Sequence, residues 1–586
     1  MFRIIKRKDA LCALGLLYRL LCVISVMVCC HLAMAQDTLA TVEFPRYYRP
    51  PLDIPISLSG NYGEFRANHF HTGYDMRIGG VVGARLSAVA DGFITRITVS
   101  SSGYGNGLYI EHPNGTTSLY GHLLDFAPAI QEYVRTKQYE QQSFSVDLPL
   151  SPEQFPVKKG DFVGRAGNSG ASGGPHLHFE LRNTETQATL NFSAYGLFPV
   201  TDRTPPVLNR LQFYSFSLQS GIPRTTLLKA VDMRASSHPI PVTDTFYIAM
   251  GAYDRMEGSY ASLSLSQYEV YLDDVKIYRY TKQNVPANYG RYLNSFLQYD
   301  RRVESDYSLL KTWVEPGNLM QNFVETPSQG LFILSDSLVH QIKIALTDDY
   351  GNTSTYRYRV TRQSPEKSAV FPIEGKRVIW AIDNYFETDG LTIYLPIGAL
   401  GKNIDLTVER LEASSIHSSQ FYAPFWRIGS PLEPLFRPMR LSIYAQVPEE
   451  FKEKALIVSM YKDSSFSAVG GEWHGTCLEA NTYNFGVYTV ALDTMPPLIT
   501  PMFSAGADLS RAQRLSFRVS DNLSGIKSYE GFIDGEWALF EYDAKYRLLS
   551  YTFDKKRIAS RKKHTLALHV TDNCNNVSIF KTDFIW

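Results

Sequence analysis

Residues 68–75 read Asn-His-Phe-His-Thr-Gly-Tyr-Asp, and residues 174–180 read Gly-Pro-His-Leu-His-Phe-Glu. These two runs decide the fold of the N-terminal region. In a strand, residues two apart face the same side. We therefore expect a strand in which His176 and His178 project together into one cavity while Leu177 packs into the opposite face.

The first run places a histidine and a carboxylate four residues apart. Gly73 and the lack of a helical pattern favour a loop that feeds a strand, with Gly73 letting the backbone bend around an ion. Imidazole and carboxylate groups are typical zinc ligands, and a zinc site with an open position commonly activates water. The two runs predict a hydrolytic zinc site, and spacing alone leaves His71, Asp75, His176 and His178 as equal candidate ligands.

The start of the chain has the pattern of a secretory signal peptide. Residues 1–35 combine a basic beginning, a mostly apolar stretch over residues 11–28, and Ala33-Met34-Ala35 as a cleavage site. An uncleaved membrane anchor is the alternative reading. We expect export to the periplasm, cell envelope or extracellular space. No transmembrane span is expected after signal cleavage, because no second run of eighteen apolar residues follows.

Charge and cysteine content narrow the class of protein. The 586 residues hold 58 basic and 58 acidic side chains, and removing residues 1–35 leaves 53 and 57. A slightly acidic chain excludes nucleic acid and anionic lipid as expected partners. Only Cys477 and Cys574 follow the signal peptide. Two cysteines can form at most one disulfide, which cannot stabilise a chain of this length, so stability must come from hydrophobic cores. Two separate thiols are the simpler expectation.

Most of the remaining sequence predicts β structure. Short runs of Val, Ile, Tyr, Phe and Thr alternate with Gly, Asn, Asp and Pro, and residues 127–142 form the one clear helical candidate. Asp202–Val207 and Asp493–Leu498 each carry a double proline before a strand-rich stretch, which suits the lead-in to an edge strand.

A second signal recurs inside those stretches. Strand-like runs end in Asp at Asp254, Asp348, Asp521 and Asp572, followed by turn residues, which is typical of β-sandwiches. We therefore expect Ig-like modules at 201–365 and 495–586, with a β-rich middle domain at 366–494. Calcium binding is an alternative use of these aspartates, but each lacks a dense local run of oxygen ligands, so turn capping is favoured.

Six of the twelve histidines after residue 35 lie between residues 69 and 178, which is more clustered than packing requires: His69, His71, His112, His122, His176 and His178. One of them lies in the run Tyr120-Gly-His122-Leu123. With the two opening runs in this order, residues 55–195 resemble the lysostaphin/LytM family of zinc endopeptidases.

The resemblance implies a mainly β protein. A LytM-like antiparallel β-sheet peptidase domain at 36–200 would be followed by the β-sandwich modules. It also implies that His71, Asp75 and His178 bind one Zn²⁺ per chain. His122 and His176 match the family's two non-ligand catalytic histidines, and the division of roles between these two stays open.

The chain departs from the family by an insertion at about residues 124–156. Such an insertion beside an active-site histidine is expected to wall or cover the substrate groove. Arg66 is a candidate substrate contact, whereas His69 and His112 match no family role and are expected to be structural.

Two other motifs are disfavoured. The Gly-rich run 164–174 lacks the Lys-Ser/Thr ending and the helix of a phosphate loop. Ser172 fits a Gly-x-Ser-x-Gly pattern, but Pro175 and a strand follow it instead of a helix.

The expected function is an exported zinc metallo-endopeptidase that hydrolyses peptide bonds in peptidoglycan cross-links. A non-catalytic LytM-like regulator and a wall-binding scaffold are alternatives, as is a protease that acts on proteins. In each case the C-terminal modules are candidates for binding the cell surface or protein partners.

Overall fold

The computed structural model describes residues 47–191, 193, 200, 202–231, 238–257, 259–363, 375–411, 421–460 and 465–586. The expected signal peptide lies outside these residues. The fold is mainly β, as predicted. Among the named strands, every pairing is antiparallel except that of β16 with β24. Within the described part of the chain, no helix is both long and apolar enough to cross a membrane.

The N-terminal unit (residues 47–191) is built on one large sheet. Its strands run in the order β1 (Leu58–Gly60), β4 (Tyr74–Arg77), β13 (His176–Asn183), β8 (Thr116–Gly121), β7 (Gly107–Glu111), β6 (Gly92–Val99) and β10 (Val146–Pro149), with β11 (Pro156–Val157) also pairing with β6. A small sheet contains β5 (Arg85–Ser87), β12 (Phe162–Ala166) and β9 (Leu123–Phe126), and β2 (Phe65–Arg66) pairs with β3 (His69–Phe70). The predicted helix is α3 (Pro128–Glu140).

The second unit (residues 202–363) packs two sheets together. One contains β15 (Ile222–Ala230), β14 (Val207–Gln219), β17 (Thr245–Tyr253), β20 (Leu310–Lys311) and β22 (Phe332–Ile333). The other contains β16 (Ile240–Val242), β24 (Thr353–Arg362), β23 (Val339–Thr347), β18 (Gln267–Leu272), β19 (Val275–Thr281) and β21 (Val324–Glu325). Short helices α4 (Leu293–Phe296) and α5 (Tyr299–Ser305) lie beside them, with 3-10 turns at Gly290–Tyr292 and Gln321–Phe323.

The third unit (residues 375–493) has its own core. One sheet contains β26 (Asn384–Thr388), β27 (Leu391–Leu395), β31 (Met439–Tyr444), β35 (Cys477–Thr482) and β34 (Glu472–His474). A second sheet contains β29 (Val408–Leu411), β30 (Phe425–Ile428), β36 (Gly486–Leu492), β32 (Ala455–Met460) and β33 (Phe466–Gly470). A third pair joins β25 (Lys376–Val378) to β28 (Ile404–Leu406), and a 3-10 helix spans Glu449–Lys454.

The C-terminal unit (residues 495–586) is a two-sheet sandwich whose shared core receives residues from both sheets. The sheets are β37 (Leu498–Pro501), β38 (Arg514–Ser520), β42 (Leu548–Thr552) and β41 (Phe540–Asp543), and β40 (Glu536–Ala538), β39 (Ile526–Ile533), β43 (Lys563–Asp572) and β44 (Val577–Ile585). The double proline precedes an edge strand here, as expected. In the second unit that expectation is wrong, because β14 pairs with strands on both sides.

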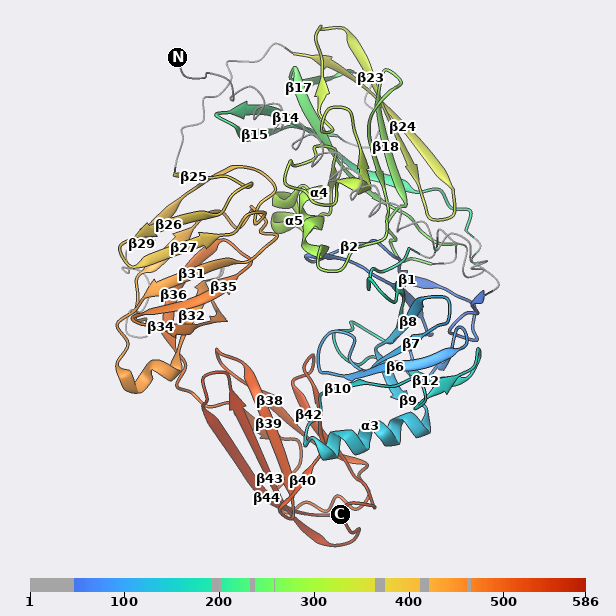
Figure 1. The fold of residues 1–586 in the computed structure, drawn as a ribbon, viewed down its shortest axis with the longest axis vertical. Helices are drawn as coiled ribbons and strands as arrows, with labels where there is room; N and C mark the ends of the chain where they lie inside the picture. The colour runs from blue at the N-terminus through green and yellow to red at the C-terminus, as the bar shows by residue number, and fades with distance from the viewer. Residues whose placement is uncertain are drawn as a thin grey trace, which may run out of the picture.

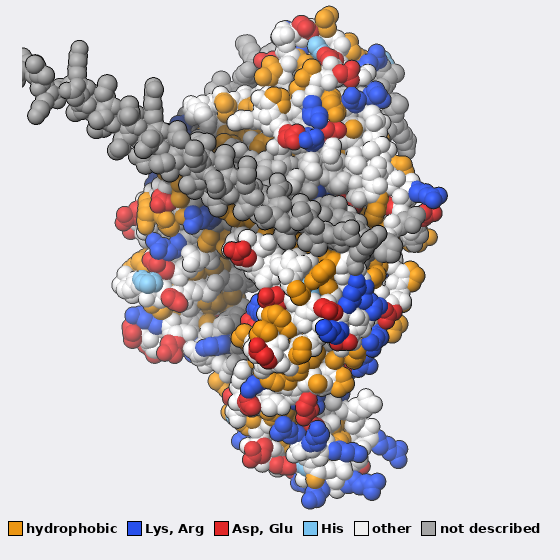
Figure 2. Space-filling view, turned by 45° about the vertical axis from the view of Figure 1, so that its right-hand side comes forward, with side chains coloured by type: hydrophobic (Ala, Val, Ile, Leu, Met, Phe, Trp, Pro, Cys, Tyr) orange, Lys and Arg blue, Asp and Glu red, His pale blue; other side chains and the backbone are white. Residues whose placement is uncertain are grey.

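The four units close into a ring in which α3 lies against the C-terminal sheets (Figure 1). The first two units share one continuous hydrophobic core, so the sequence boundary near residue 200 does not separate their packing. Cys477 and Cys574 are both free thiols, in line with the simpler expectation. Figure 2 shows acidic and basic side chains mixed over much of this face, with Lys and Arg gathered at the end formed by the C-terminal unit.

A buried charge cluster joins the second and third units. Lys311 Nζ donates to Glu315 Oε1 over 2.7 Å, and the Nζ of Lys402, from the third unit, lies 3.6 Å from the same oxygen. The side chains of Lys311 and Glu315 are 6% and 2% exposed. Water therefore cannot replace either partner.

Replacing Glu315 by Leu should destabilise the protein by about 3–5 kcal/mol, because it leaves a buried ammonium group without its partner. Scanning calorimetry should show a lower transition temperature. Glu409, in an exposed ion pair with Arg427, is the control, and Glu409→Leu should change stability by less than about 1 kcal/mol. Equal shifts in the two variants would contradict this interpretation.

Candidate functional site

The register in which β13 pairs with its two neighbouring strands brings the candidate site residues together. His178 lies opposite Asp75 on β4 and opposite Gly121 on β8. Leu177 is fully buried on the other face, as the alternation predicts. This register brings the two opening sequence runs together with the residue that precedes His122.

His71, Asp75 and His178 form a compact group of possible metal ligands. Asp75 Oδ1 lies 3.0 Å from His71 Nε2 and 2.9 Å from His178 Nδ1, and these two nitrogens are 3.1 Å apart. All three side chains are buried. As expected, a loop feeds a strand here: His71 begins the loop that follows β3, and Asp75 lies in β4, the strand after it. Gly73 serves this loop by its small size, because an added Cβ would lie 2.6 Å from the Phe179 carbonyl oxygen and 2.8 Å from the His178 ring.

The outer hydrogen bonds fix the orientation of both candidate ligand imidazoles. His71 Nδ1–H donates to the Asn61 carbonyl oxygen over 2.8 Å, and His178 Nε2–H donates to Glu180 Oε1 over 2.9 Å. Each ring thus turns its other nitrogen toward Asp75, where its lone pair can bind a metal ion once the nitrogen has lost its proton. Two such nitrogens and a carboxylate oxygen at about 3 Å from one another repel unless a cation, either a proton or a metal ion, lies between them. Two imidazoles and a carboxylate are a donor set that fits Zn²⁺.

The local charges also favour a cation. Burial alone would raise the pKa of Asp75, but hydrogen bonds from His176, His178 and His71 hold it well below its usual range. Burial opposes protonation of His178, yet the carboxylates of Asp75 and Glu180 raise its pKa to about 9. In the metal-free site a proton on His178 Nδ1 thus takes the place between this ring and Asp75 that a metal cation would occupy.

His122 and His176 complete the cleft without joining the ligand group. Their ring centroids are 4.9 Å apart, and His176 Nε2 lies 3.4 Å from Asp75 Oδ1. His122 Nδ1 bonds to the Ser169 carbonyl oxygen and His176 Nδ1 to the Gly174 carbonyl oxygen, each over 2.8 Å. His122 therefore keeps its Nε2 available as a proton acceptor, whereas His176 directs its Nε2 toward Asp75.

The backbone and surroundings of His122 are unusual. Its φ is +62°, a left-handed conformation that is uncommon for a residue with a side chain and that concentrates at functional sites. Burial, together with nearby His178 and His176, lowers the pKa of His122 to about 3. The ring is thus neutral near pH 7, with no proton on its Nε2.

The cleft around these residues has a volume of about 640 Å³. Besides the five predicted side chains, its lining includes Arg66, His69, Thr72, Tyr104 and the turn at Ala171–Gly173. None of the lining residues comes from 124–156, so the expectation that the insertion walls the groove is wrong. The reason is that α3 packs on the C-terminal unit instead.

The other residues singled out in the sequence each have identifiable hydrogen-bond partners. Arg66 donates to Asp75 Oδ2 over 2.8 Å, so it contacts a candidate ligand directly. His69 Nδ1 bonds to the Ala67 carbonyl oxygen, and His112 bonds to the Asp91 carbonyl oxygen and the Ser118 hydroxyl. Ser172 donates to the Gly174 carbonyl oxygen and precedes a strand, which agrees with its exclusion as a nucleophile.

Sequence reasoning gave no role to Glu180, which is fully buried behind His178. Its Oε1 accepts hydrogen bonds from the hydroxyls of Tyr104 and Thr72 over 2.6 and 2.7 Å, and its Oε2 accepts one from Arg182. The sequence did carry one indication of this role: Glu180 is two residues after His178 on the same strand, so both side chains face the same side. Nothing in the sequence indicated Tyr104, Asn61 or Ser169.

Comparisons with known proteins agree with the motifs. The chain is 35% identical over 112 residues to the DD-carboxypeptidase/endopeptidase Mpg of Neisseria meningitidis serogroup B and, equally, of Neisseria gonorrhoeae. That match covers 19% of this chain and 20% of each relative, so the chain spans about one fifth of the length of these curated relatives. Residues 376–493 match the Zu5-like domain family.

Two solved structures are also similar to part of the chain. The catalytic domain of the prophage-encoded M23 protein EnpA from Enterococcus faecalis is 26% identical, with a TM-score of 0.18, covering 24% of this chain and 92% of that one. The catalytic domain of lysostaphin from Staphylococcus simulans is 23% identical, with a TM-score of 0.16, covering 21% and 78%.

Replacing Glu180 by Gln should lower zinc affinity by about 10–100-fold, because the charge that orients and polarises His178 is removed. Competition with a chromogenic chelator measures this change. Glu111→Gln, at the end of β7 in the same sheet, removes the same charge away from the ligands and should keep the parental affinity. Equal affinities in the two variants would show that Glu180 does not support the ligand.

Proposed function

Because the N-terminal unit of this chain is of the lysostaphin/LytM type, we propose that the protein is an exported zinc metallo-endopeptidase that cleaves peptide bonds in peptidoglycan cross-links. The observation that carries this proposal is the complete five-residue site. His71, Asp75 and His178 converge within about 3 Å of one another, and His122 and His176 line the same cleft beside them. The Neisseria relatives are named as a carboxypeptidase and endopeptidase, which supports a peptide substrate.

His71, Asp75 and His178 would hold the zinc. When bound, zinc supplies Lewis-acid polarisation of the scissile carbonyl and lowers the pKa of water toward about 7. Glu180 and the Asn61 carbonyl oxygen keep the two ligand rings in the tautomers that binding needs.

The two remaining histidines supply proton transfer. The Nε2 of His122 or His176 accepts a proton from the attacking water, and the resulting imidazolium can later donate it to the leaving amine. The Ser169 and Gly174 carbonyl oxygens hold the Nδ1–H of each ring, so the rings face the cleft throughout. Once it is protonated, the ring can also steady the tetrahedral oxyanion by donating a hydrogen bond from Nε2–H.

A non-catalytic regulator is the second candidate function. Such a protein would be expected to have lost part of the ligand and histidine set. Here all five positions are filled and brought together, which favours an enzyme. Wall targeting through the C-terminal unit is compatible with catalysis and is proposed as an accompanying role.

Three histidine variants separate metal binding from turnover. His71→Ala should lose zinc, whereas His122→Ala should keep it while turnover falls by about 10²–10⁴-fold, the usual contribution of acid–base catalysis. His69→Ala is the control for zinc content, since its ring lies outside the ligand group. Metal analysis and mass spectrometry of fragments from defined peptidoglycan measure both properties. Full activity in His71→Ala or His122→Ala would overturn the assignment.

A further inference from the structure

Three aspartates from distant segments meet in the second unit. Asp202 precedes the double proline, Asp254 follows β17, and Asp348 follows β23. One carboxylate oxygen from each lies within 4.8 Å of the others. A second such group lies where the third unit meets the C-terminal unit, with Asp493, at the end of the third unit, and Asp521 and Asp572 of the C-terminal unit. The aspartates that punctuate the sequence therefore converge in space.

Turn capping, the expected role, explains part of this arrangement. Asp348 Oδ1 accepts hydrogen bonds from the backbone N–H groups of Tyr350 and Asn352, and its Oδ2 accepts one from the Asn352 side chain over 2.7 Å. Capping does not explain Asp202 Oδ2 or Asp254 Oδ1. Both oxygens are buried without a hydrogen-bond partner, and Asp254 is only 2% exposed. Such atoms are costly unless a ligand meets them.

No positive side chain offsets this charge among the described residues. The nearby Lys282 pairs with Asp349 over 2.9 Å, and none of the three aspartates joins an ion pair. Burial and the neighbouring Asp348 and Asp202 raise the pKa of Asp254 to about 7. The three carboxylates therefore repel one another where they meet.

We propose that Asp202, Asp254 and Asp348 bind one Ca²⁺ ion. The donors are all oxygen, without nitrogen or sulfur, which suits a hard cation, and Ca²⁺ tolerates the irregular geometry of ligands drawn from three loops. The sequence prediction of turn capping considered only local runs of oxygen ligands, whereas these three aspartates come from separate segments. The proposal is confined to this group, in which two of the three aspartates have a buried oxygen without a hydrogen-bond partner, whereas in the C-terminal group only Asp521 does.

Calorimetric titration of the full zinc-loaded chain with CaCl₂ tests this site. Asp254→Asn should bind one equivalent of calcium fewer than the parent, and calcium should raise its melting temperature less. Asp244→Asn, an exposed position before β17, should match the parent. Asp202→Asn is a second route if Asp254→Asn folds poorly. No calcium binding by the parent up to millimolar concentration, or parental stoichiometry in folded Asp254→Asn or Asp202→Asn, would overturn the proposal.

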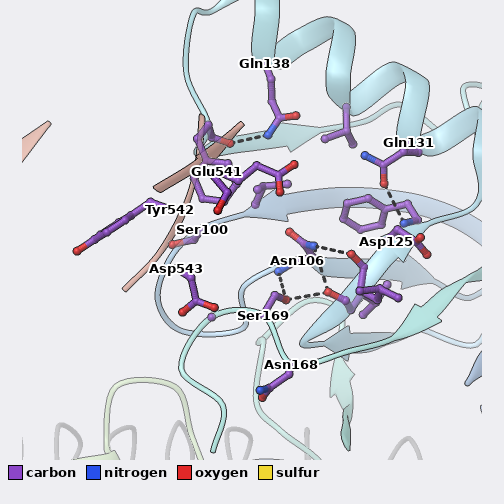
Figure 3. Close-up of a pocket in the computed structure, with 18 of the residues that line it drawn as sticks. Ser100, Asn106, Asp125, Gln131, Gln138, Asn168, Ser169, Glu541, Tyr542 and Asp543 are labelled. Atoms are coloured by element: carbon purple, nitrogen blue, oxygen red, sulfur yellow. Dashed lines mark hydrogen bonds between the residues drawn. The ribbon is translucent and has the colours of Figure 1, made fainter. Parts of the chain in front are cut away.

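A separate observation links the C-terminal unit to the histidine cleft. Lys545, in the hairpin between β41 and β42, donates from Nζ to the carbonyl oxygens of Asn168 and Gly170 over 2.6 and 3.0 Å. Figure 3 shows this loop, with Asn168 and Ser169, facing Asp543 across a pocket of about 490 Å³ between the two units. The carbonyl between the two that Lys545 binds belongs to Ser169, and it holds His122 Nδ1.

The insertion helix reinforces the same contact. The rings of Tyr139 on α3 and Trp537 on β40 lie 5.2 Å apart, and the Arg557 guanidinium lies 3.8 Å from the centre of the Tyr139 ring. Arg135 on α3 pairs with Asp554 over 3.6 Å. The insertion thus serves as a docking surface for the C-terminal unit.

We infer that Lys545 is a positioning residue that orients His122 through the 168–170 loop. This inference rests on the proposed function for its effect on turnover, but not for its effect on the ring. By fixing the carbonyls on both sides of Ser169, the ammonium group fixes the acceptor of the His122 Nδ1–H bond. A displacement of about 1 Å in such a group can lower turnover by about 10²-fold.

Lys545→Met tests this inference against Lys555→Met, which removes an exposed charge from the same unit. In Lys545→Met, kcat should fall by about 10–100-fold with KM and zinc content close to the parent, and Lys545→Arg should recover part of the loss. Nitrogen-15 NMR of histidine-labelled protein should show altered His122 ring signals in Lys545→Met only.

The NMR measurement tests the positioning role of Lys545 separately from the proposed peptidase function. If the parent cleaves no peptidoglycan, the proposed function fails, but a selective change in the His122 ring signals still supports the positioning role. Parental ring signals and, where the parent is active, parental kcat in Lys545→Met would overturn it.

Discussion

The double pairing of β13 is the constraint on which the site depends. Because β4 and β8 flank β13 in fixed register, Asp75 and Gly121 lie opposite His178 on its two sides. A shift of one residue would turn the two histidines of β13 into the core and Leu177 toward the cleft. The fully buried Leu177 and Glu180 oppose such a shift. The candidate metal ligands Asp75 and His178 are therefore positioned by the same packing that stabilises the sheet.

The local part of this arrangement could be predicted from the sequence. Alternation in 174–180, the glycine in 71–75 and the pattern at 127–142 each depend on neighbouring residues. For that reason the strand, the loop and the helix agree with expectation. The five site residues also meet as the motifs indicated.

What the sequence could not supply is long-range. Ser169 binds His122 through a backbone carbonyl, which any residue type offers, so no motif marks it. The helix of the insertion was predictable, but its partner surface near Trp537 lies some four hundred residues later. Likewise, Asp202, Asp254 and Asp348 look like separate turn residues until the fold assembles them. Contacts that depend on tertiary packing, rather than on residue type, account for each of these differences.

The ring of units has a consequence for the order in which the protein matures. Lys545 meets its acceptors across separations of 375 and 377 residues. The entropy of closing so long a loop rises only with the logarithm of its length, so the equilibrium cost stays small. The order of folding is affected more than the equilibrium, because synthesis runs from the N-terminus and domains fold as they emerge. The histidine cleft can therefore form early but gains its last contact only after nearly the whole chain has been made, so that a fragment ending before the final unit would carry the complete motif set with an unsupported loop.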